Sequence, residues 1–533
     1  MPGWGVGVLV ATGHQQRTYL FADGSRRTFK EDFIAQFIES APPPDEVAQQ
    51  RIERGAKSVA MPKAINLALE AQIKAAPGDA DAFMIYGDWL QEQGDPRGEL
   101  VAIQRHLERA PGDKQVKKAE AALLAKHGAY LVPPLLWQMV QLPKRGAERN
   151  RSEITWRAGF IDRVRIARAS DRAPALRDVL HELLHHPAAQ FMRSLTIGPL
   201  GTAKRFDYRP VVSEIAKAKP AALEELVVGD FGPNDIELDY AMLGNAYPML
   251  AACTNLRRLV LRASSARFDS PIKHANLREL LVTAGTITER TLENFFAAAL
   301  PALETLELAC PGLRLTTAEA DLLASATGMP KLQRLALRQS MSTSVLVASL
   351  LGRPLLRQLR ELDLSGGDLE DGTVMMLVHR QDAIRHLRVL DVGGNQITPS
   401  RVQLLAGLTE EVRVDEQRTP GVIDAGAVLA LAPDAASGAA ARKLARPDRG
   451  WLAIGRDGNR LWGEFEGSDF YYVMATVNGQ RMGCSCASAK DPCKHALALL
   501  LMATQHHIAE SKIPEAVVRN TQSRTRWFEH GEY

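Results

Sequence analysis

The sequence predicts an α/β solenoid with smaller modules on both sides of it. Two observations lead to this prediction: an apolar pattern of the form L-x-x-L-x-L recurs eight times, and stretches with helical periodicity separate its copies. A third is length, because 533 residues exceed what one ordinary core encloses, so several domains are expected.

The copies of the pattern occupy residues 192–415. They start 21 to 33 residues apart, a period typical of units that contain one strand and one helix. They resemble leucine-rich repeats of the ribonuclease-inhibitor type, which implies a horseshoe in which each unit buries its leucines against its neighbours. In the last copy, Asn395 can bond backbone groups at the turn. The copies begin at Met192, Leu223, Leu256, Leu277, Leu303, Leu332, Leu359 and Leu387.

Three segments precede the repeats. Residues 1–44 alternate like strands and predict a small β module. Residues 61–127 are helical, and Asp88-Trp89-Leu90 with Gly94-Asp95-Pro96 resembles the repeat-companion segment that often precedes leucine-rich repeats. We expect Asp95 to cap a helix there rather than to bind a metal. Residues 128–191 are expected to form an entry cap for the repeats, with strands at 156–161 and 164–166.

A cluster of soft metal ligands lies near the end of the chain. Cys484, Cys486, Cys493 and His495 fall within twelve residues. In a strand, residues i and i+2 point the same way, so Cys484 and Cys486 can hold one ion from one side. Pro492 ends that strand, and the other two ligands fall at the start of a helix expected at 496–509, where unpaired amides favour a thiolate. Four sulfur and nitrogen ligands predict one structural Zn²⁺.

The spacing C-x-C-x6-C-x-H closely resembles the SWIM zinc finger. This resemblance implies that all four residues bind zinc and that the module contacts DNA or protein. The predicted finger spans residues 446–510, between a linker at 416–445 and a tail at 511–533. A cluster of reduced cysteines without metal is the alternative, whereas disulfides are disfavoured because no secretory signal precedes them.

A second motif, His181-Glu182-Leu183-Leu184-His185, reads as H-E-x-x-H. On a helix it would place two histidines on one face with a glutamate as general base, as in a metallohydrolase. Against this interpretation, His186-Pro187 ends the helix, and no later helix offers an obvious third ligand. Leu180, Leu183 and Leu184 also give the motif an ordinary packing role. We therefore expect no enzyme here, and a count of two zinc ions per chain would revive the alternative.

The charge pattern favours a protein partner over nucleic acid. Lysines and arginines number 65 and acidic residues 62, so the whole chain carries no strong field. The outward positions of the repeat strands, which would line the concave face, are mixed in sign, and we expect that face to bind a protein. They include Arg258, Arg262, Arg334 and Arg338, against Glu225, Glu279, Glu307, Glu361, Asp363 and Asp391.

The function predicted is therefore that of a non-enzymatic adaptor, in which the repeats bind a protein and the zinc finger a second macromolecule. DNA binding through Arg481, Lys490, Lys494 and the basic tail is the alternative. No apolar run is long enough for a membrane helix, so no membrane partner is expected. Five cysteines and the lack of an export signal predict a cytoplasmic location.

Overall fold

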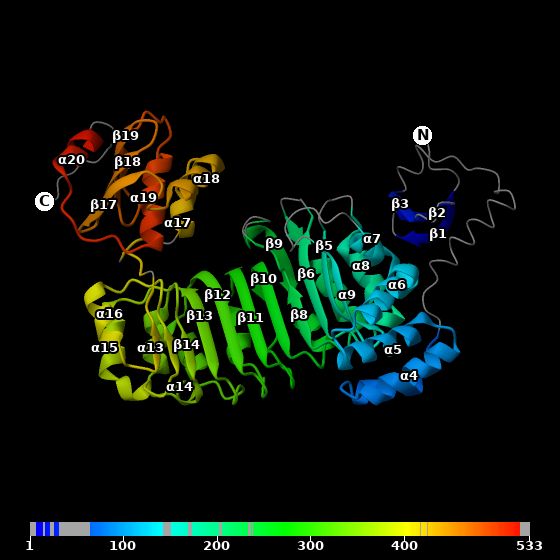
Figure 1. The fold of residues 1–533 in the computed structure, drawn as a ribbon. Helices are drawn as coiled ribbons and strands as arrows, with labels where there is room; N and C mark the ends of the chain where they lie inside the picture. The colour runs from blue at the N-terminus through cyan, green and yellow to red at the C-terminus, as the bar shows by residue number, and fades with distance from the viewer. Residues whose placement is uncertain are drawn as a thin grey trace. The chain divides into compact units, whose positions relative to one another are not determined.

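The computed structural model describes part of the chain in two compact units, Met1–Ile236 and Glu237–Tyr533 (Figure 1). The described residues are 7–13, 16–21, 26–30, 64–141, 151–168, 173–201, 205–232, 236, 238–415, 417–419, 421–423 and 425–522.

The first unit begins with the small β module that the alternating pattern predicts. Strands β1 (Gly7–Gly13), β2 (Gln16–Phe21) and β3 (Arg26–Lys30) pair antiparallel in chain order. The rest of the predicted module, residues 1–6, 14–15, 22–25 and 31–44, lies outside the described residues.

The predicted helical segment follows, and two of its helices pack unusually closely. A side chain at Gly98 of α5 would meet the carbonyl oxygen of Gly87 of α4 at 2.5 Å, so only glycine permits this helix crossing. Asp95 is the N-cap of α5, as expected, and its Oδ1 accepts a hydrogen bond from the Arg97 amide at 3.0 Å. The helices are α3 (Leu67–Ala75), α4 (Ala80–Glu92), α5 (Pro96–Arg109), α6 (Lys114–Leu131) and α7 (Pro134–Val140).

The predicted entry cap at 128–191 contains a hairpin, and the copies of the repeat that begin at Met192 and Leu223 follow it as parallel strands. The strand expected at 156–161 is interrupted, because Ala158 and Gly159 have φ of 47° and 79° and turn the chain between β4 and β5. From β5 onwards the sheet is parallel, in the order β5-β6-β8, and helices connect its strands. The elements are β4 (Glu153–Arg157), β5 (Phe160–Arg168), α8 (Leu176–Leu184), β6 (Ser194–Leu200), β7 (Phe206–Asp207), α9 (Arg209–Ala218) and β8 (Glu225–Val228).

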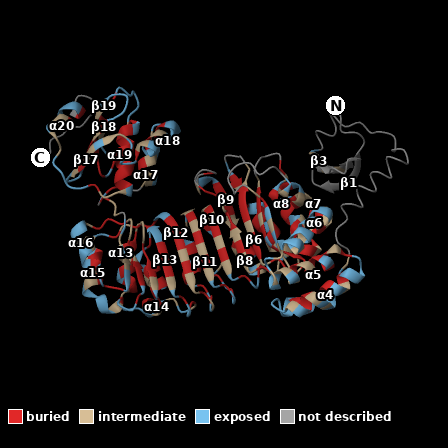
Figure 2. Cartoon of the chain, in the orientation of Figure 1, coloured by how far each residue is buried: buried red, intermediate tan, exposed pale blue. Residues whose placement is uncertain are grey.

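The second unit contains the regular repeats, and its strand register confirms the leucine pattern. In the last six of the eight predicted copies, the middle leucine of each copy pairs with the middle leucine of the next, in the series Leu259, Leu280, Leu306, Leu335, Leu362 and Leu390. All six side chains are at most 2% exposed, and buried and less buried positions alternate along the strands (Figure 2). The strands are β9 (Ala241–Asn245), β10 (Arg258–Arg267), β11 (Glu279–Thr286), β12 (Thr305–Leu313), β13 (Arg334–Ser340), β14 (Glu361–Asp363), β15 (Val389–Asp391) and β16 (Glu411–Arg413).

From β11 onwards helices return the chain from each strand to the next, as the sequence predicts for leucine-rich repeats, whereas no helix lies among the described residues between β10 and β11. The helical stretches expected between the copies include α11 at Glu289–Phe296 and α13 at Thr343–Leu350. The others are α10 (Tyr247–Ala252), α12 (Thr317–Ala324), α14 (Pro354–Gln358), α15 (Asp371–His379) and α16 (Pro399–Leu405).

Asn395 closes the turn of the last repeat, as expected. It is fully buried, its Nδ2 donates to the carbonyl oxygens of Leu364 and Val392, both at 2.9 Å, and its Oδ1 accepts from the Leu369 amide at 2.9 Å. One side chain thus satisfies backbone groups of two neighbouring repeats, which would otherwise be buried without partners.

Replacing Asn395 with alanine is therefore expected to destabilise the last two repeats by roughly 2–5 kcal/mol, because each buried group left unpaired costs about 1–3 kcal/mol. Hydrogen exchange of β14 and β15 measures this. Asn276→Ala is the control, since Asn276 is exposed and donates only to the Thr254 carbonyl at 3.0 Å. Equal exchange in both variants would contradict the role of Asn395.

The end of the second unit is an antiparallel sheet with helices packed on it. Strands β17 (Trp451–Asp457), β18 (Arg460–Glu466), β19 (Phe470–Thr476) and β20 (Met482–Cys484) pair in chain order. Helix α19 (Lys494–Gln505) follows the sheet, α17 (Ala425–Ala430) and α18 (Ala435–Leu444) precede it, and α20 (Glu515–Gln522) comes last.

The core of this module includes parts of the predicted linker and tail. Val428 of α17 is fully buried in one cluster with Leu497 of α19. Val517 of α20 is fully buried against Trp462 and Met474 of the sheet, so the described start of the tail is docked. The apolar core therefore reaches beyond residues 446–510 at both ends. Among the described helices, none is long and apolar enough to cross a membrane.

Candidate metal centre

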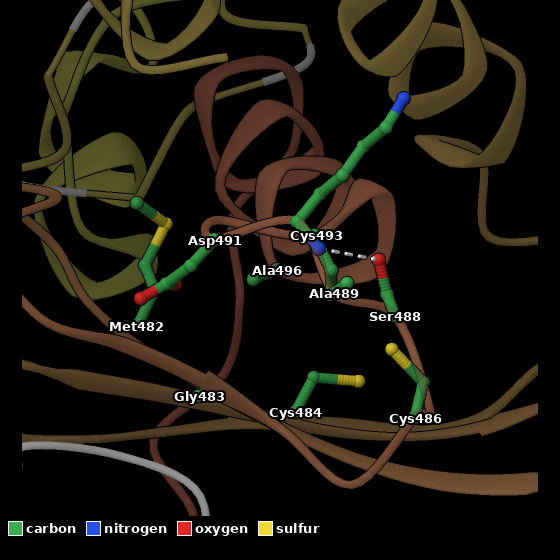
Figure 3. A pocket seen from close by; sticks show the side chains of 10 residues that line it. Met482, Gly483, Cys484, Cys486, Ser488, Ala489, Asp491, Cys493 and Ala496 are labelled. Carbon is green, nitrogen blue, oxygen red and sulfur yellow. Dashed lines mark hydrogen bonds between the residues drawn. The ribbon is translucent and has the colours of Figure 1, made fainter. Parts of the chain in front are cut away.

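Two parts of the C-terminal module bring the four predicted zinc ligands together. Cys484 is the last residue of β20, Cys486 lies two residues further on, and Cys493 is the N-cap of α19, whose second residue is His495. The four residues are 5–9% exposed, and the three cysteines line one pocket together with residues of the loop between them. Figure 3 shows the sulfur atoms of Cys484 and Cys486 directed into the same space.

The spacing of the donor atoms suits a single tetrahedral ion. One donor atom from each of the four residues lies within 4.8 Å of every other, and Cys484 Sγ is 3.7 Å from His495 Nδ1. Zinc–sulfur bonds of about 2.3 Å at tetrahedral angles place ligand atoms about 3.8 Å apart. The four residues are therefore arranged as a zinc-binding site, and the chemistry of three sulfurs and one imidazole fits Zn²⁺.

One detail of the sequence prediction is wrong. Cys484 and Cys486 do not share a strand, because β20 ends at Cys484. Pairing continues for one residue only, with the Ser485 amide donating to the Tyr472 carbonyl at 2.9 Å. The chain then bends at Cys486, and this bend rather than strand alternation brings the second sulfur towards the first.

The helix start at Cys493 has the predicted effect only in part, because the hydrogen bond from Cys484 is the main cause of the lowered pKa. The hydrogen bond from Cys484, assisted by His495 and by the amide of Ala496, lowers the pKa of Cys493 to about 4 although burial opposes this. The same bond between sulfurs, together with burial, raises the pKa of Cys484, and burial raises that of Cys486. Without a cation these contacts favour the thiolate form at Cys493 only. A bound dication would favour the thiolate form of Cys484 and Cys486 as well. The helix itself ends at Gln505, four residues before the predicted end.

Two aromatic rings that sequence reasoning missed hold the imidazole of His495. Tyr471 stacks on it with ring centroids 4.9 Å apart, and Phe465 lies on it at 4.9 Å with a tilt of 39°. These residues pair directly across β18 and β19, so the hairpin register places both rings at the ligand. The alternation of side chains between the two faces of β18 and β19 was the signal that could have identified these two rings.

The ligand loop is tied to the preceding helices by an ion pair. Lys490 Nζ lies 2.8 Å from the carboxylate of Asp434, the N-cap of α18, and this hydrogen bond is the main reason that the pKa of Asp434 falls to about 2. Lys490 is one of the three basic residues near the zinc site, with Arg481 and Lys494, that the DNA-binding alternative uses. It is thus already paired with a carboxylate of the same chain.

The remaining cysteines are buried thiols, as expected. Burial raises the pKa of Cys253 to about 12 and that of Cys310 to about 11, so both are almost entirely protonated near neutral pH. They can therefore serve as internal controls for the reactivity of the three clustered cysteines.

Thiol labelling of the native, zinc-loaded chain at pH 8 is accordingly expected to be slow at all five cysteines. Removing zinc with a strong chelator should make Cys484, Cys486 and Cys493 react quickly, with Cys253 and Cys310 still protected until the chain unfolds. Mass spectrometry of the labelled peptides separates the two groups. Fast labelling of the three residues before chelation would contradict zinc ligation.

The H-E-x-x-H motif lies elsewhere, in the first unit. His181 is on α8, and His185 is the C-cap that follows it. The sequence offered no obvious third ligand on a later helix, and in the structure Glu214 of α9 brings an oxygen to 2.6 Å from His181 Nδ1. Glu182, the predicted general base, accepts a hydrogen bond from the Leu135 amide in the first turn of α7 at 2.9 Å.

The family model of the SWIM zinc finger matches residues 483–503. Among the curated proteins, none matches the chain. The fold is similar to a protein of Bacteroides fragilis, with 22% identity, a TM-score of 0.43 and coverage of 48% of this chain and 74% of that one.

Two further structures are similar over longer or shorter stretches. For a leucine-rich repeat protein of Leptospira interrogans the identity is 18%, the TM-score 0.26 and the coverage 44% of this chain and 51% of that one. For the yeast Rad7 and Elc1 complex the identity is 13%, the TM-score is 0.25, and the coverage is 64% of this chain and 96% of that one.

The chain thus carries a SWIM zinc finger beside leucine-rich repeats. The match contains all four ligands, Cys484, Cys486, Cys493 and His495, and the repeats follow from the strand register itself. It is a zinc-binding repeat protein.

Proposed function

We propose that this chain is a non-enzymatic adaptor whose repeats bind a protein and whose zinc finger binds a second macromolecule. The observation that carries the proposal is the charge arrangement on the solvent-facing side of the repeat strands. There, arginines of β10 and β13 pair with carboxylates of the neighbouring strands, and this surface is called the charged strand face below.

Arg334 of β13 is the centre of the charged strand face. Its guanidinium nitrogens lie 3.2 Å from Glu361, 3.1 Å from Asp363 and 3.5 Å from Glu307, on the strands to either side. Arg338 of the same strand lies 3.5 Å from Glu307. Arg258 and Glu279 form a further pair across β10 and β11.

This pairing makes nucleic acid a poor match for the charged strand face. Binding to phosphates gains free energy when cations of the protein replace counterions, and cations that already contact carboxylates gain less. Mixed charges give specificity towards a protein surface of complementary pattern. Asp391, whose pKa is raised by its partial burial, adds a carboxylate next to this pattern at β15.

The zinc finger supports the second binding role mainly because its ligand loop would be rigid. The ion would hold the loop 484–495 in one conformation, so that its exposed residues, such as Lys494, are presented without a large loss of entropy on binding. Because thiolates are the ligands, the proposal also implies a reducing compartment, in agreement with the expected cytoplasmic location.

A pull-down with the full chain tests the protein-binding role. Arg338→Glu reverses a charge on the charged strand face at a side chain that is 48% exposed. Arg353→Glu is the matched control, because that side chain is 49% exposed and also faces a carboxylate, Asp321, but lies at the start of α14. We expect the captured protein to fall at least tenfold with Arg338→Glu and to stay with Arg353→Glu. Equal capture by both variants would refute the proposal.

DNA binding through the finger remains the alternative outcome. DNA binding would be shown by an affinity for DNA that falls steeply as the salt concentration rises and that is lost in the double variant Lys490→Glu/Lys494→Glu. The ion pair of Lys490 with Asp434 argues against it, since one of the few cations near the zinc is already neutralised. Arg524 and Arg526 of the tail lie outside the described residues.

A further inference from the structure

Two histidines and a glutamate meet on the surface of the first unit, apart from the zinc finger. His181 belongs to α8, His185 caps that helix, and Glu214 comes from α9, 33 residues further along the chain. One donor atom from each residue lies within 4.8 Å of the other two. Both imidazoles are exposed, whereas the carboxylate is buried beneath them.

Hydrogen bonds leave one nitrogen of each imidazole available. His185 Nδ1 is 2.8 Å from the carbonyl oxygen of His181, and because a carbonyl only accepts, Nδ1 carries the proton. His181 Nδ1 is 2.6 Å from Glu214 Oε1, so it donates to the carboxylate in the same way. In both rings Nε2 then keeps its lone pair. The ring centroids are 4.5 Å apart, so the two nitrogens can reach one ion.

Glu214 is placed as a carboxylate partner of a metal-binding histidine would be. Its side chain is only 6% exposed, and its second oxygen lies 3.9 Å from Arg177 Nε. A buried carboxylate that orients an imidazole or joins it at the metal is the usual companion of such sites. It fixes the position of His181, although that ring is 61% exposed.

We propose that His181 and His185 bind one divalent cation of the zinc, nickel or copper class through their Nε2 atoms, with Glu214 holding the ring of His181 in place. Imidazole nitrogens suit these ions, whereas Mg²⁺ and Ca²⁺ prefer oxygen ligands alone. Two protein donors leave the other positions open to water. Glu182 contacts the Leu135 amide instead of the ion, so the site binds a metal without the general base of a metallohydrolase. The proposal does not depend on the adaptor function.

Zinc titration of the full chain against a chromophoric chelator tests the site, starting from protein whose finger is already filled. The wild type is expected to take up one further equivalent. His181→Ala and His185→Ala should each weaken this second equivalent at least tenfold, and Glu214→Gln should weaken it too. The control is His379→Ala, because His379 is exposed and its Nδ1 likewise contacts the carbonyl four residues earlier, at 2.6 Å, without belonging to a donor cluster.

A wild type that takes up no second equivalent would overturn the proposal, as would a His181→Ala/His185→Ala variant that binds it unchanged. His185→Ala removes an exposed ring, so its melting curve should match that of the wild type and exclude misfolding as the cause. Cys493→Ser separates the two sites, since it should remove the equivalent bound in the finger and leave the second one intact. Loss of both equivalents in Cys493→Ser would also overturn the assignment.

Discussion

Cys486→Ser is expected to loosen residues near 450–510 while the repeats stay folded. Zinc binding contributes on the order of 10–16 kcal/mol in small zinc domains, and much of this is folding free energy. Loss of one thiolate removes a large share of it and leaves Cys484, Cys493 and His495 buried around an incomplete site. The apolar cluster around Leu497 can retain α19, so we expect the largest change in β20 and in the loop that follows it.

Limited proteolysis and hydrogen exchange of the full chain measure this effect. New cleavage should fall within the module, and exchange of β20 should rise by orders of magnitude, with β10 to β15 unchanged. Ser488→Ala is the matched control, because its hydroxyl lies on the same loop and only accepts a hydrogen bond from the Lys490 amide at 3.2 Å. If Cys486→Ser were cleaved like the wild type, zinc would not be holding the module.

Arg97→Met is expected to destabilise the helices α4 and α5 by about 3–5 kcal/mol, because it leaves a buried carboxylate without its partner. Arg97 is fully buried, its Nε lies 3.0 Å from Asp95 Oδ1, and its Nη2 lies 2.8 Å from Asp95 Oδ2. Nη2 also donates to the carbonyl oxygen of Ala64 at 2.6 Å, which anchors the start of this segment. The guanidinium lies over the ring of Phe160 at 5.6 Å.

The free energy of opening, obtained from hydrogen exchange in α4 and α5, tests this prediction. Arg105→Met is the control on the same helix, because Arg105 pairs with Glu108 at 2.7 Å in a partly exposed position, where such a pair contributes at most about 1 kcal/mol. Asp95→Asn combined with Arg97→Met should recover much of the loss, since it removes the unpaired charge but keeps a helix cap. No recovery in the double variant would mean that packing of Arg97, not its charge, stabilises the segment.

The repeats were predictable because the leucines that stabilise them recur in a short local pattern, L-x-x-L-x-L. Each strand places a leucine at the same position, and stacking of identical units then dictates the register from Leu259 to Leu390. The ligands Cys484, Cys486, Cys493 and His495 were predictable for a similar reason, since all lie within twelve residues and need no distant partner.

Contacts made by distant segments were not predictable in this way. Glu214 meets His181 only because α8 and α9 pack against each other within the first unit, and no local sequence pattern at either residue predicts this contact. Val517 is buried against the sheet although it belongs to the segment 511–533, which the sequence predicts only as a tail. The rings that hold His495 depend on the hairpin register, which turn positions determine more than composition does.

The central claim is that four buried donors bind one structural zinc ion. Elemental analysis tests it most directly, on reduced full-length protein dialysed against a weak chelator so that loosely bound metal is removed. We predict one zinc per chain in the wild type and in His181→Ala/His185→Ala, and none in Cys493→Ser. A metal-free wild type, or an unchanged zinc content in Cys493→Ser, would contradict the account.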